Sequence, residues 1–485
     1  MVELRRRSTK KKKIIFIHLD LGIGGAEQLV LSLAAASQDA GHDVTIVTSH
    51  CSQKHCFDQV KKPEGRLCQN VLVWGKFLPS NIMGIATAFC SSLRMIYLSY
   101  WTAKRFGQSA NLIVLDVLPT SIPFLTTWVR AGIIFYCHFP DKLLTRDTVN
   151  GEPTAAVEQR SWLRTAYRNF LDDIEERTMN YADVLVVNSK FTKSQVQQVF
   201  PSLQRNQISV LYPALDAAKF SSQNFSNAKS SKSSIISLNR FERKKNIELL
   251  IKAYALLQLR MNQVPSLIIA GGYDMRNIEN VEYLQELKDL VSKLSIKDVQ
   301  FQRSISDEMR SRLMRNALCV VYTPHLEHFG IVPIEAMYAG TPVIAVNSGG
   351  PKETVLDQQT GFLCDGNPEA FYSALSKLVK NPTLSTTMGA AGREHVVEKF
   401  GSTRFQKQWV QIVDEGIEMG KVRRMNQRRS YIVWRSFYYF LDAILAFGAA
   451  ALFTYLLRRV GLLEENQHII GVLQKLMTGL VEKFD

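Results

Sequence analysis

Residues 327–335 read Glu327-His328-Phe329-Gly330-Ile331-Val332-Pro333-Ile334-Glu335. The apolar run Ala317–Tyr322, a few residues earlier, has the length of a buried strand. Pro333 suits the first turn of a helix that ends near Gly340. The sequence therefore predicts a strand, a loop and a helix, with Glu327 at the carboxyl end of the strand and Glu335 just inside the helix. Strand, loop and helix form the repeating unit of α/β proteins, so this stretch indicates an α/β fold.

The two glutamates stand where an α/β protein binds its ligands. Such ligands lie at the carboxyl ends of the strands, and backbone N–H groups at a helix start can hold a diphosphate without a metal. Two carboxylates there can accept hydrogen bonds from two vicinal diols, one on a sugar and one on a ribose. A single glutamate more often only caps or solvates its helix. The pair, the loop Phe329-Gly330 and the later Gly349-Gly350 together favour a nucleotide-sugar site.

The length of the chain predicts two domains. It has 485 residues and is 46% apolar, whereas single cores stop growing near ~250 to 300 residues. Strand and helix patterns alternate in both halves, which predicts two parallel sheets with helices on both faces. We expect a basic tail (1–13), a first Rossmann-like domain for the acceptor (14–215), a polar linker (216–234), a second Rossmann-like domain for the nucleotide sugar (235–400), a crossover helix with a basic stretch (401–430), a hydrophobic membrane segment (431–459) and a tail (460–485).

A glycine-rich turn opens the first half. It follows the apolar strand Ile14–Ile17 and reads Gly22-x-Gly24-Gly25. Dinucleotide binding would require Gly-x-Gly-x-x-Gly, but position 27 is Glu, and no Gly-Lys-Ser/Thr follows that would indicate a P-loop. We expect Gly24 and Gly25 to let a ligand approach the backbone closely. A purely structural tight turn is the alternative.

The cysteines and acidic residues predict neither disulfides nor a metal. The seven cysteines are odd in number and lack Cys-x-x-Cys spacing, which is typical of reduced cytosolic thiols. No Asp-x-Asp triplet occurs in the chain. We therefore expect no cofactor and no metal, and cationic side chains must stabilise any departing phosphate.

The net charge of +15 is concentrated near the two ends. Basic residues crowd Arg5–Arg7 and Lys10–Lys13, and others between 421 and 429 precede the apolar segment Trp434–Leu457. Basic runs beside apolar segments bind the cytosolic leaflet of a membrane, at about 1 kcal/mol per Lys or Arg near the surface. No nucleic-acid module accompanies them, so we expect a lipid bilayer and no nucleic acid as partner.

Three apolar stretches bear on the membrane. Trp434–Leu457 is long enough to span a bilayer but carries Asp442, so a transmembrane helix and a hairpin lying on the surface both remain possible. Ile82–Trp101 and Leu112–Trp128 are not convincing spans, and the first fits an interfacial helix or a core helix equally well. The amino end lacks a signal-peptide pattern, so we expect the catalytic part on the cytosolic side.

Four further motifs carry a resemblance to a known family. They read Leu19-Asp20-Leu21-Gly22-Ile23-Gly24-Gly25-Ala26-Glu27, Tyr136-Cys137-His138-Phe139-Pro140-Asp141, Val187-Asn188-Ser189-Lys190-Phe191-Thr192 and Asn239-Arg240-Phe241-Glu242-Arg243-Lys244-Lys245-Asn246. With Glu-x7-Glu they make nearly the whole chain resemble retaining glycosyltransferases of the GT-B fold, in which two Rossmann-like domains face a cleft. Together the four motifs resemble those of the α-1,3/1,6-mannosyltransferases of the dolichol-linked oligosaccharide pathway, which assembles the N-glycan precursor.

The resemblance implies an activity and its partners. Mannose would pass from GDP-mannose to the dolichol-pyrophosphate-linked oligosaccharide Man-GlcNAc2-PP-dolichol, and one enzyme would form both the α-1,3 and the α-1,6 linkage. The enzyme would lie at the endoplasmic reticulum membrane with its catalytic domains on the cytosolic face. Other mannosyltransferases of the early pathway would be its protein partners.

The resemblance also implies roles for individual residues. Arg240 and Lys245 would neutralise the diphosphate, with Lys244 as the alternative to Lys245. Glu327 would contact the mannose hydroxyls, and Glu335 the ribose diol. The remaining expected contacts are the backbone of Phe329-Gly330-Ile331 and the turn Gly24-Gly25 on the donor, His138 on the transferred sugar, and Asp141 and Lys142 on the acceptor side.

Two other functions stay open at this point. One is a GT-B transferase with a different sugar or lipid-linked acceptor, such as the phosphatidylinositol glycosyltransferases, which share Glu-x7-Glu. The other is a membrane scaffold without catalysis, which predicts that Glu335→Ala and Lys245→Ala variants keep their function.

Overall fold

The computed structural model describes residues 11–81, 87–144, 148–149, 152–153, 162–204, 207–215 and 234–426. The expected membrane segment 431–459, the tail 460–485 and nearly all of the expected linker 216–234 lie outside these residues. The chain divides into two compact units, Met1–Arg424 and Met425–Asp485, and the first unit holds both large sheets.

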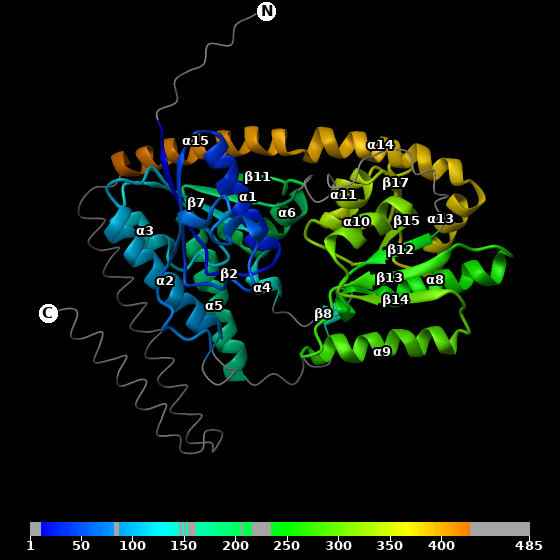
Figure 1. The fold of residues 1–485 in the computed structure, drawn as a ribbon. Coiled ribbons are helices and arrows are strands. Elements are labelled where there is room, and N and C mark those ends of the chain that lie inside the picture. Colours follow the sequence, from blue (N-terminus) through cyan, green and yellow to red (C-terminus); the bar gives the residue numbers. More distant parts are fainter. Residues whose placement is uncertain are drawn as a thin grey trace, which may run out of the picture. The chain divides into compact units, whose positions relative to one another are not determined.

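The first large sheet has seven parallel strands in the order β11-β10-β7-β6-β1-β3-β5 (Figure 1). The chain starts in the middle at β1, builds one side, and then returns to the other side of β1 with β6. The strands are therefore added in opposite directions on the two sides of the boundary between β1 and β6. Such a topological switch point, where the sheet changes direction, is the place where α/β sheets bind ligands. The strands are β1 (Lys13–Ile17), β3 (Asp43–Thr48), β5 (Val71–Val73), β6 (Leu112–Asp116), β7 (Gly132–Cys137), β10 (Val184–Val187) and β11 (Ile208–Val210).

Helices connect these strands. They are α1 (Gly25–Asp39), α2 (Thr87–Phe106), α3 (Ile122–Trp128), α4 (Asp141–Leu144), α5 (Trp162–Met179) and α6 (Lys190–Val199). The short elements of this half are the parallel pair β2 (Asp20–Leu21) and β4 (His50–Cys51), the antiparallel pair β8 (Thr148–Val149) and β9 (Glu152–Pro153), and the 3-10 helices η1 (Asp58–Val60), η2 (Cys68–Asn70) and η4 (Pro201–Leu203).

The second large sheet has six parallel strands in the order β14-β13-β12-β15-β16-β17. Its strand order reverses between β12 and β15, so this boundary is the topological switch point of the second sheet. Its strands are β12 (Ser234–Leu238), β13 (Ser266–Gly271), β14 (Val299–Arg303), β15 (Ala317–Tyr322), β16 (Val343–Val346) and β17 (Gly361–Cys364). Its helices are η5 (Arg243–Lys245), α8 (Ile247–Arg260), α9 (Ile278–Lys293), α10 (Asp307–Asn316), α11 (Ile331–Tyr338), α12 (Pro351–Thr354), α13 (Pro368–Lys380) and α14 (Pro382–Phe400).

Both sheets are covered on both faces, which explains the unbroken apolar runs in their strands. Side chains along a strand alternate between the two faces. In β1, Ile14 and Phe16 pack with α1 on one face, while Ile15 and Ile17 pack with α2 and α3 on the other. All four are buried. A strand that is buried on both faces cannot alternate polar and apolar residues, and the prediction of two parallel sheets with helices on both faces is confirmed.

The helix α15 (Ser402–Asn426) packs against the first sheet, on the same face as α1 (Figure 1). Trp409 on this helix is fully buried, and its Nε1 donates to Ser37 Oγ at 2.8 Å. Near the end of the helix, Arg423 Nε donates to Asp183 Oδ1 at 2.9 Å. A segment that follows the second sheet in sequence therefore completes the core of the first.

Among the described residues, no helix is long and apolar enough to cross a membrane. The apolar stretch Leu112–Trp128 contains β6 and α3. In the stretch Ile82–Trp101, residues 87–101 belong to α2. The segment Trp434–Leu457 lies outside the described residues.

Candidate active site

Lys245 and Glu327 meet where the second sheet changes direction. Lys245 ends η5 after β12, and Glu327 follows β15, the neighbouring strand. Lys245 Nζ donates to Glu327 Oε2 at 2.6 Å, and the two side chains are 12% and 23% exposed. Thr323 Oγ1 donates to the Lys245 carbonyl at 2.7 Å, which fixes the backbone that carries the ammonium. The carboxyl ends of two adjacent strands thus hold one cation and one carboxylate in a defined pair.

Glu327 is ionised at neutral pH. Burial by itself would raise the pKa of this carboxyl, but the nearby Lys245 ammonium outweighs it and brings the pKa below its usual value. An ionised carboxylate accepts hydrogen bonds and donates none. Glu327 can therefore accept from sugar hydroxyls once Lys245 turns toward another anion.

Arg240 and Lys244 point elsewhere in the same loop. The Arg240 guanidinium is 64% exposed, and Lys244 is 65% exposed; each lies 3.1 Å from the carboxylate of Glu242. Of the two neighbouring lysines, the structure brings Lys245 to Glu327 and Lys244 to Glu242. Arg240 remains open to solvent, so a ligand can reach its guanidinium.

The loop Phe329-Gly330-Ile331 joins Glu327 to α11. Gly330 has a φ of 77°, which strains any other residue, and a Cβ there would also make a tight contact of 3.2 Å with the Tyr322 ring. The helix starts at Ile331 and leaves unpaired N–H groups in its first turn. The backbone expected to contact the donor is thus at a helix start.

Gly349 and Gly350 support this loop from behind. A Cβ on Gly349 would lie 2.5 Å from the Glu327 carbonyl oxygen, and one on Gly350 would lie 2.3 Å from that of Phe329. Gly350 N donates to the Glu327 carbonyl at 2.7 Å. These glycines allow close packing of two backbones, which fixes Glu327 in place.

Glu335 lies on α11 and forms an ion pair with Arg310 of α10. Its side chain is 12% exposed and that of Arg310 32%. The sequence interpretation did not include Arg310, because an arginine on an amphipathic helix carries no signal of its own. The guanidinium orients the carboxylate that is expected to contact the ribose.

The first sheet contributes His138, which follows β7. Its Nε2 donates to Asp116 Oδ2 at 3.0 Å, and Asp116 Oδ1 lies 2.7 Å from His18 Nδ1. His18 follows β1 and Asp116 ends β6, so the group sits where the first sheet changes direction. Burial would raise the pKa of Asp116, but the two imidazoles outweigh it and lower that pKa to about 2. Sequence reasoning missed Asp116 and His18; the available signal was a polar residue ending each apolar strand run.

The glycine turn before α1 has two different roles. A Cβ on Gly24 would lie 2.3 Å from a carboxylate oxygen of Glu27, so this glycine makes room for that side chain. A Cβ on Gly25 would have nothing within 4 Å, so the first residue of α1 borders open space. Only Gly25 leaves free room beside the start of the helix.

Asp141 and Lys142 begin α4, and their backbone N–H groups donate to the carboxylate of Glu175. The Glu175 carboxylate accepts from Asp141 N at 2.7 Å and from Lys142 N at 3.1 Å, and burial raises its pKa to about 7. Lys142 Nζ donates to the Val199 carbonyl at 3.3 Å and lies over the Phe200 ring. The structure therefore turns the Lys142 ammonium toward the end of α6 rather than toward His138.

His328 connects the two groups of site residues. Its ring stacks on Phe139 with the centroids 3.6 Å apart, and its carbonyl accepts from Ser189 Oγ at 2.6 Å. Burial lowers the pKa of His328 to about 4, so the imidazole is neutral at pH 7. Phe139 and Ser189 lie in loops that follow strands of the first sheet, and His328 lies in a loop that follows a strand of the second, so loops of both halves are in contact.

Glu353, on α12, makes a second connection that sequence reasoning missed. Its carboxylate accepts from Lys190 N at 2.9 Å and from Phe191 N at 2.5 Å, the first two residues of α6 in the first half. Tyr212 Oη donates to the same carboxylate at 2.9 Å. An acidic side chain from one half thus caps a helix of the other half.

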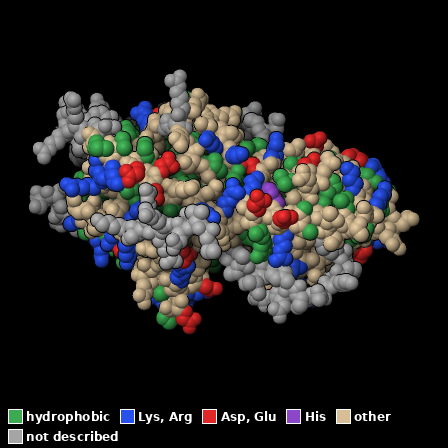
Figure 2. All heavy atoms as spheres, turned by 90° about the horizontal axis from the view of Figure 1, so that it is seen from above, with side chains coloured by type: hydrophobic (Ala, Val, Ile, Leu, Met, Phe, Trp, Pro, Cys, Tyr) green, Lys and Arg blue, Asp and Glu red, His purple; other side chains and the backbone are tan. Residues whose placement is uncertain are grey.

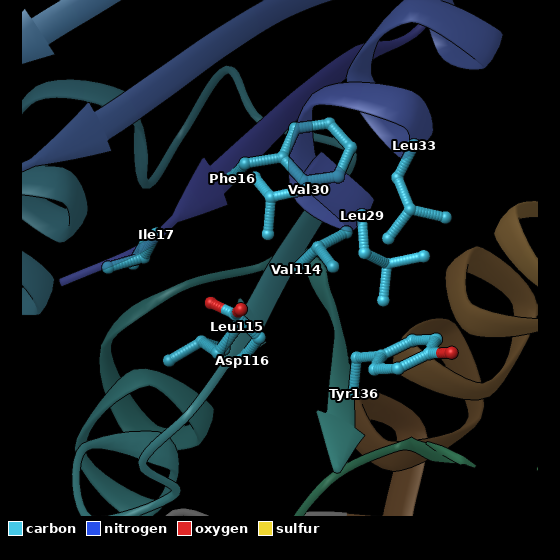
Figure 3. Close-up of a pocket in the computed structure, with 9 residues that line it drawn as sticks. All are labelled: Phe16, Ile17, Leu29, Val30, Leu33, Val114, Leu115, Asp116 and Tyr136. Carbon is cyan, nitrogen blue, oxygen red and sulfur yellow. The ribbon is translucent and has the colours of Figure 1, made fainter. Parts of the chain in front are cut away.

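Nine residues, including Asp116, surround a small internal space in the first half (Figure 3). Asp116 and Tyr136 are its polar members, and Tyr136 Oη donates to the Leu211 carbonyl at 2.8 Å. The others are Phe16, Ile17, Leu29, Val30, Leu33, Val114 and Leu115. The space belongs to the packed interior of the first sheet and not to a sugar site.

The described residues hold no group of three or more His, Cys, Asp or Glu arranged to bind a metal.

Two sequence families match the chain in succession. The family described as "Glycosyltransferase Family 4" matches residues 23–219, and the family described as "Glycosyl transferases group 1" matches residues 219–395. Together they span residues 23–395, which contain every strand of the two large sheets except β1.

Curated relatives match over nearly their whole length. The alpha-1,3/1,6-mannosyltransferase ALG2 of Homo sapiens is 40% identical over 416 residues, which is 83% of this chain and 96% of the relative. The protein of the same name from Dictyostelium discoideum is 37% identical over 424 residues, 82% of this chain and 97% of the relative. That from Schizosaccharomyces pombe is 37% identical over 454 residues, 87% of this chain and 86% of the relative.

Solved structures share the fold at low sequence identity. A sucrose-phosphate synthase from Thermosynechococcus elongatus has a TM-score of 0.64 at 21% identity, covering 84% of this chain and 99% of the other. A glycosyltransferase from Rickettsia africae has a TM-score of 0.61 at 17% identity, with 84% and 99% covered. The expected architecture of two Rossmann-like domains in the GT-B fold is confirmed.

Proposed function

The chain belongs to the family of α-1,3/1,6-mannosyltransferases, and on that basis we propose how its site carries out the transfer. The enzyme transfers mannose from GDP-mannose in the synthesis of the N-glycan precursor, forming α-1,3 and α-1,6 linkages. The acceptor in our proposal is Man-GlcNAc2-PP-dolichol, and the configuration at the anomeric carbon is retained.

The Lys245–Glu327 pair is the observation that carries the donor half of this proposal. A sugar nucleotide brings a diphosphate with negative charge, which competes with Glu327 for the Lys245 ammonium. As the glycosidic bond breaks, charge grows on the β-phosphate, and a cation already in position stabilises it most. Glu327, released from Lys245, accepts hydrogen bonds from the mannose hydroxyls.

The other donor contacts follow from the same geometry. The exposed Arg240 guanidinium adds a second charge on the diphosphate. No side chain caps the start of α11 at Gly330 and Ile331, and the start of α1 at Gly25 borders open space, so both helix starts offer N–H groups to phosphate oxygens. Glu335, oriented by Arg310, accepts from the ribose diol. In this arrangement two cationic side chains do what a metal does elsewhere, so we propose transfer without a metal.

A pair of neighbouring lysine variants tests the donor half. The full-length protein is assayed with GDP-mannose, Man-GlcNAc2-PP-dolichol and a chelator, and the products are analysed for mass and linkage. We expect Lys245→Ala to lower kcat by about a hundredfold or more for both linkages. Lys244→Ala, which loses only an exposed contact with Glu242, should keep nearly full activity. Equal activity of the two variants would refute the role of Lys245, and transfer abolished by the chelator would refute independence of metal.

The acceptor half rests on His138 and the loop that follows it. His138 projects from the first sheet, and its backbone carbonyl accepts from Asn188 Nδ2 at 2.9 Å. We propose that its imidazole faces the transferred mannose and that Asp141, at the start of α4, lies on the acceptor side. For Lys142, the contact with the Val199 carbonyl supports a role in holding α4 rather than in contacting the acceptor.

An aromatic face on the first half supports contact with a bilayer. Trp128 and Phe77 are exposed, at 56% and 68%, and Tyr100 lies in edge contact with Trp128. Lys104 lies over the ring of Trp101, which contacts Tyr100 in the same face. Aromatic and basic side chains together are typical of membrane interfaces. We propose that this face, and the segment 431–459, bind the cytosolic side of the endoplasmic reticulum membrane, where the lipid-linked acceptor is found.

Two partner expectations stay predictions. One is association with other mannosyltransferases of the early pathway. The other is that no nucleic acid binds; on the face shown in Figure 2, Lys and Arg side chains are interspersed with acidic and apolar ones, unlike a continuous basic groove.

A further inference from the structure

Asp116 lies between two imidazoles and contacts one with each oxygen. Oδ1 is 2.7 Å from His18 Nδ1, and Oδ2 is 3.0 Å from His138 Nε2. The side chains of His18 and Asp116 are 3% and 2% exposed, whereas that of His138 is 25% exposed. The arrangement is therefore a buried pair that ends in one accessible histidine.

The contacts of His18 determine its protonation state. Its Nδ1 faces the Asp116 carboxylate, and its Nε2 lies 3.0 Å from the Asp20 carbonyl oxygen. A carbonyl oxygen and an ionised carboxylate are both acceptors, so both ring nitrogens must donate. Only the imidazolium has two N–H groups. His18 is thus a buried cation, in agreement with its raised pKa: burial would lower that pKa, but Asp116 outweighs the burial.

The cation changes what Asp116 does to His138. A lone buried carboxylate beside a histidine favours the imidazolium, because opposite charges attract strongly in a medium of low dielectric constant. Here the His18 imidazolium already balances the Asp116 carboxylate. Asp116 still accepts from His138 Nε2–H, which leaves the Nδ1 of His138 as the free lone pair.

We propose that His18 and Asp116 are positioning residues for mannosyl transfer: the His18–Asp116 ion pair holds His138 as a neutral imidazole whose Nδ1 accepts a hydrogen bond from a substrate hydroxyl. This inference rests on the proposed place of His138 at the transferred sugar. A protonated His138 would donate from Nδ1 instead and could not accept a hydrogen bond there.

Other charged and titratable groups surround this set. Glu27, on α1, acts on His18 through its charge and supports the imidazolium. The neutral His328 of the second half lies close enough to His138 that a charge on His138 would lower the pKa of His328. The Tyr136 ring lies 5.1 Å from the His138 ring. None of these groups supplies a second cation beside Asp116, so only the His18 imidazolium balances the negative charge of the Asp116 carboxylate.

The His18 imidazolium also contacts the segment that leads into the glycine turn before α1. The Asp20 carbonyl accepts from His18 Nε2, and the Asp20 carboxylate is bound by Arg94, with Nη1 to Oδ2 at 3.0 Å. Asp20 stands two residues before Gly22, where the turn to α1 begins. His18 therefore links the position of His138 to the backbone that borders the donor.

The test uses the full-length protein labelled with 13C at Cε1 of histidine. Comparison with His138→Gln assigns the resonance of His138, and its titration midpoint is followed from about pH 5 to pH 9 by NMR. We expect His18→Gln to move the midpoint of His138 upward by about one pH unit or more, because a like charge has been removed. Asp116→Asn should move it downward. His50→Gln, which changes an exposed histidine in the neighbouring β4, is the matched control and should leave it unchanged.

Enzyme kinetics then separate the inference from the proposed function. We expect the acid limb of the kcat profile to move upward in His18→Gln together with the NMR midpoint, while folding measured by circular dichroism is retained. A His138 midpoint that stays in place or falls in His18→Gln would overturn the inference. A midpoint that rises while the acid limb stays fixed would instead overturn the role of His138 in the transfer, and with it that part of the proposed function.

Discussion

The Glu353 carboxylate should hold the start of α6, and Glu353→Gln tests this directly. The carboxylate accepts from the backbone N–H groups of Lys190 and Phe191 and from the Tyr212 hydroxyl. An amide keeps one acceptor oxygen but replaces the other with an NH2 group, which faces a donor. A hydrogen bond to a charged group contributes about 1.5 to 3 kcal/mol, and the charge at a helix start about 0.3 to 1 kcal/mol.

We expect the substitution to weaken this contact by about 2 to 3 kcal/mol, because the losses are not fully additive. At about 1.4 kcal/mol per factor of ten, the amides of Lys190 and Phe191 should exchange with solvent roughly 30 to 150 times faster. Hydrogen exchange measured by mass spectrometry on peptides covering 188–199 reads this change. Glu394→Gln, an exposed glutamate on α14, is the matched control. Unchanged exchange at 190 and 191 in Glu353→Gln would refute the reasoning.

Three further outcomes are expected. Arg310→Met should raise the KM for GDP-mannose about tenfold with little effect on kcat, because it removes the ion-pair partner of Glu335. Arg312→Met, on the exposed side of α10, is the control and should leave the KM unchanged. Equal KM values for the two variants in steady-state kinetics would contradict this role of Arg310. Because the pKa of His328 is lowered to about 4 from 6.5, the folded chain keeps this ring neutral where the unfolded chain protonates it, so its contribution to stability is present above pH 6.5 and is lost as the pH falls toward 4. In urea unfolding, the free energy of unfolding should fall less between about pH 7 and pH 5 in His328→Phe than in the unsubstituted protein. An identical fall in both proteins would argue against this contribution of His328. Replacing Trp128 and Phe77 together by Ser should raise the KM for the lipid-linked acceptor in phosphatidylcholine–phosphatidylserine vesicles but not that for GDP-mannose, whereas equal effects on both would count against a membrane-binding face.

The architecture was largely predictable because parallel strands buried on both faces leave a plain signal. The run Ala317–Tyr322 was expected as a strand and forms β15 with the same ends, and Ile14–Ile17 forms β1 with one residue added. The helix expected from the proline runs from Ile331 to Tyr338 and carries Glu335 in its second turn. Position-specific motifs also identified the family, since they depend on residue type at fixed spacing.

The side-chain network was less predictable, because its members show no pattern of their own. Asp116 appeared only as a charge inside an apolar stretch, and Glu353 and Arg310 looked like ordinary helix residues. Lys142 is expected on the acceptor side, and that role stays a prediction; the sequence did not indicate that its ammonium contacts the end of α6. Local sequence gives the type of a residue and its helix or strand, but not the direction of a long side chain, which depends on what surrounds it.

The sequence by itself determined the two α/β halves, the Glu-x7-Glu motif and the family, because apolar runs and local turn residues fix strands and helices over short distances. Only the tertiary structure decided which strands are neighbours. The crossover from β12 to β15 brings Lys245 to Glu327 across 82 positions, and the crossover from β1 to β6 brings His18 to Asp116 across 98. Strand order in a parallel sheet is set by how helices pack across the strands, and that packing couples residues that no short stretch of sequence contains.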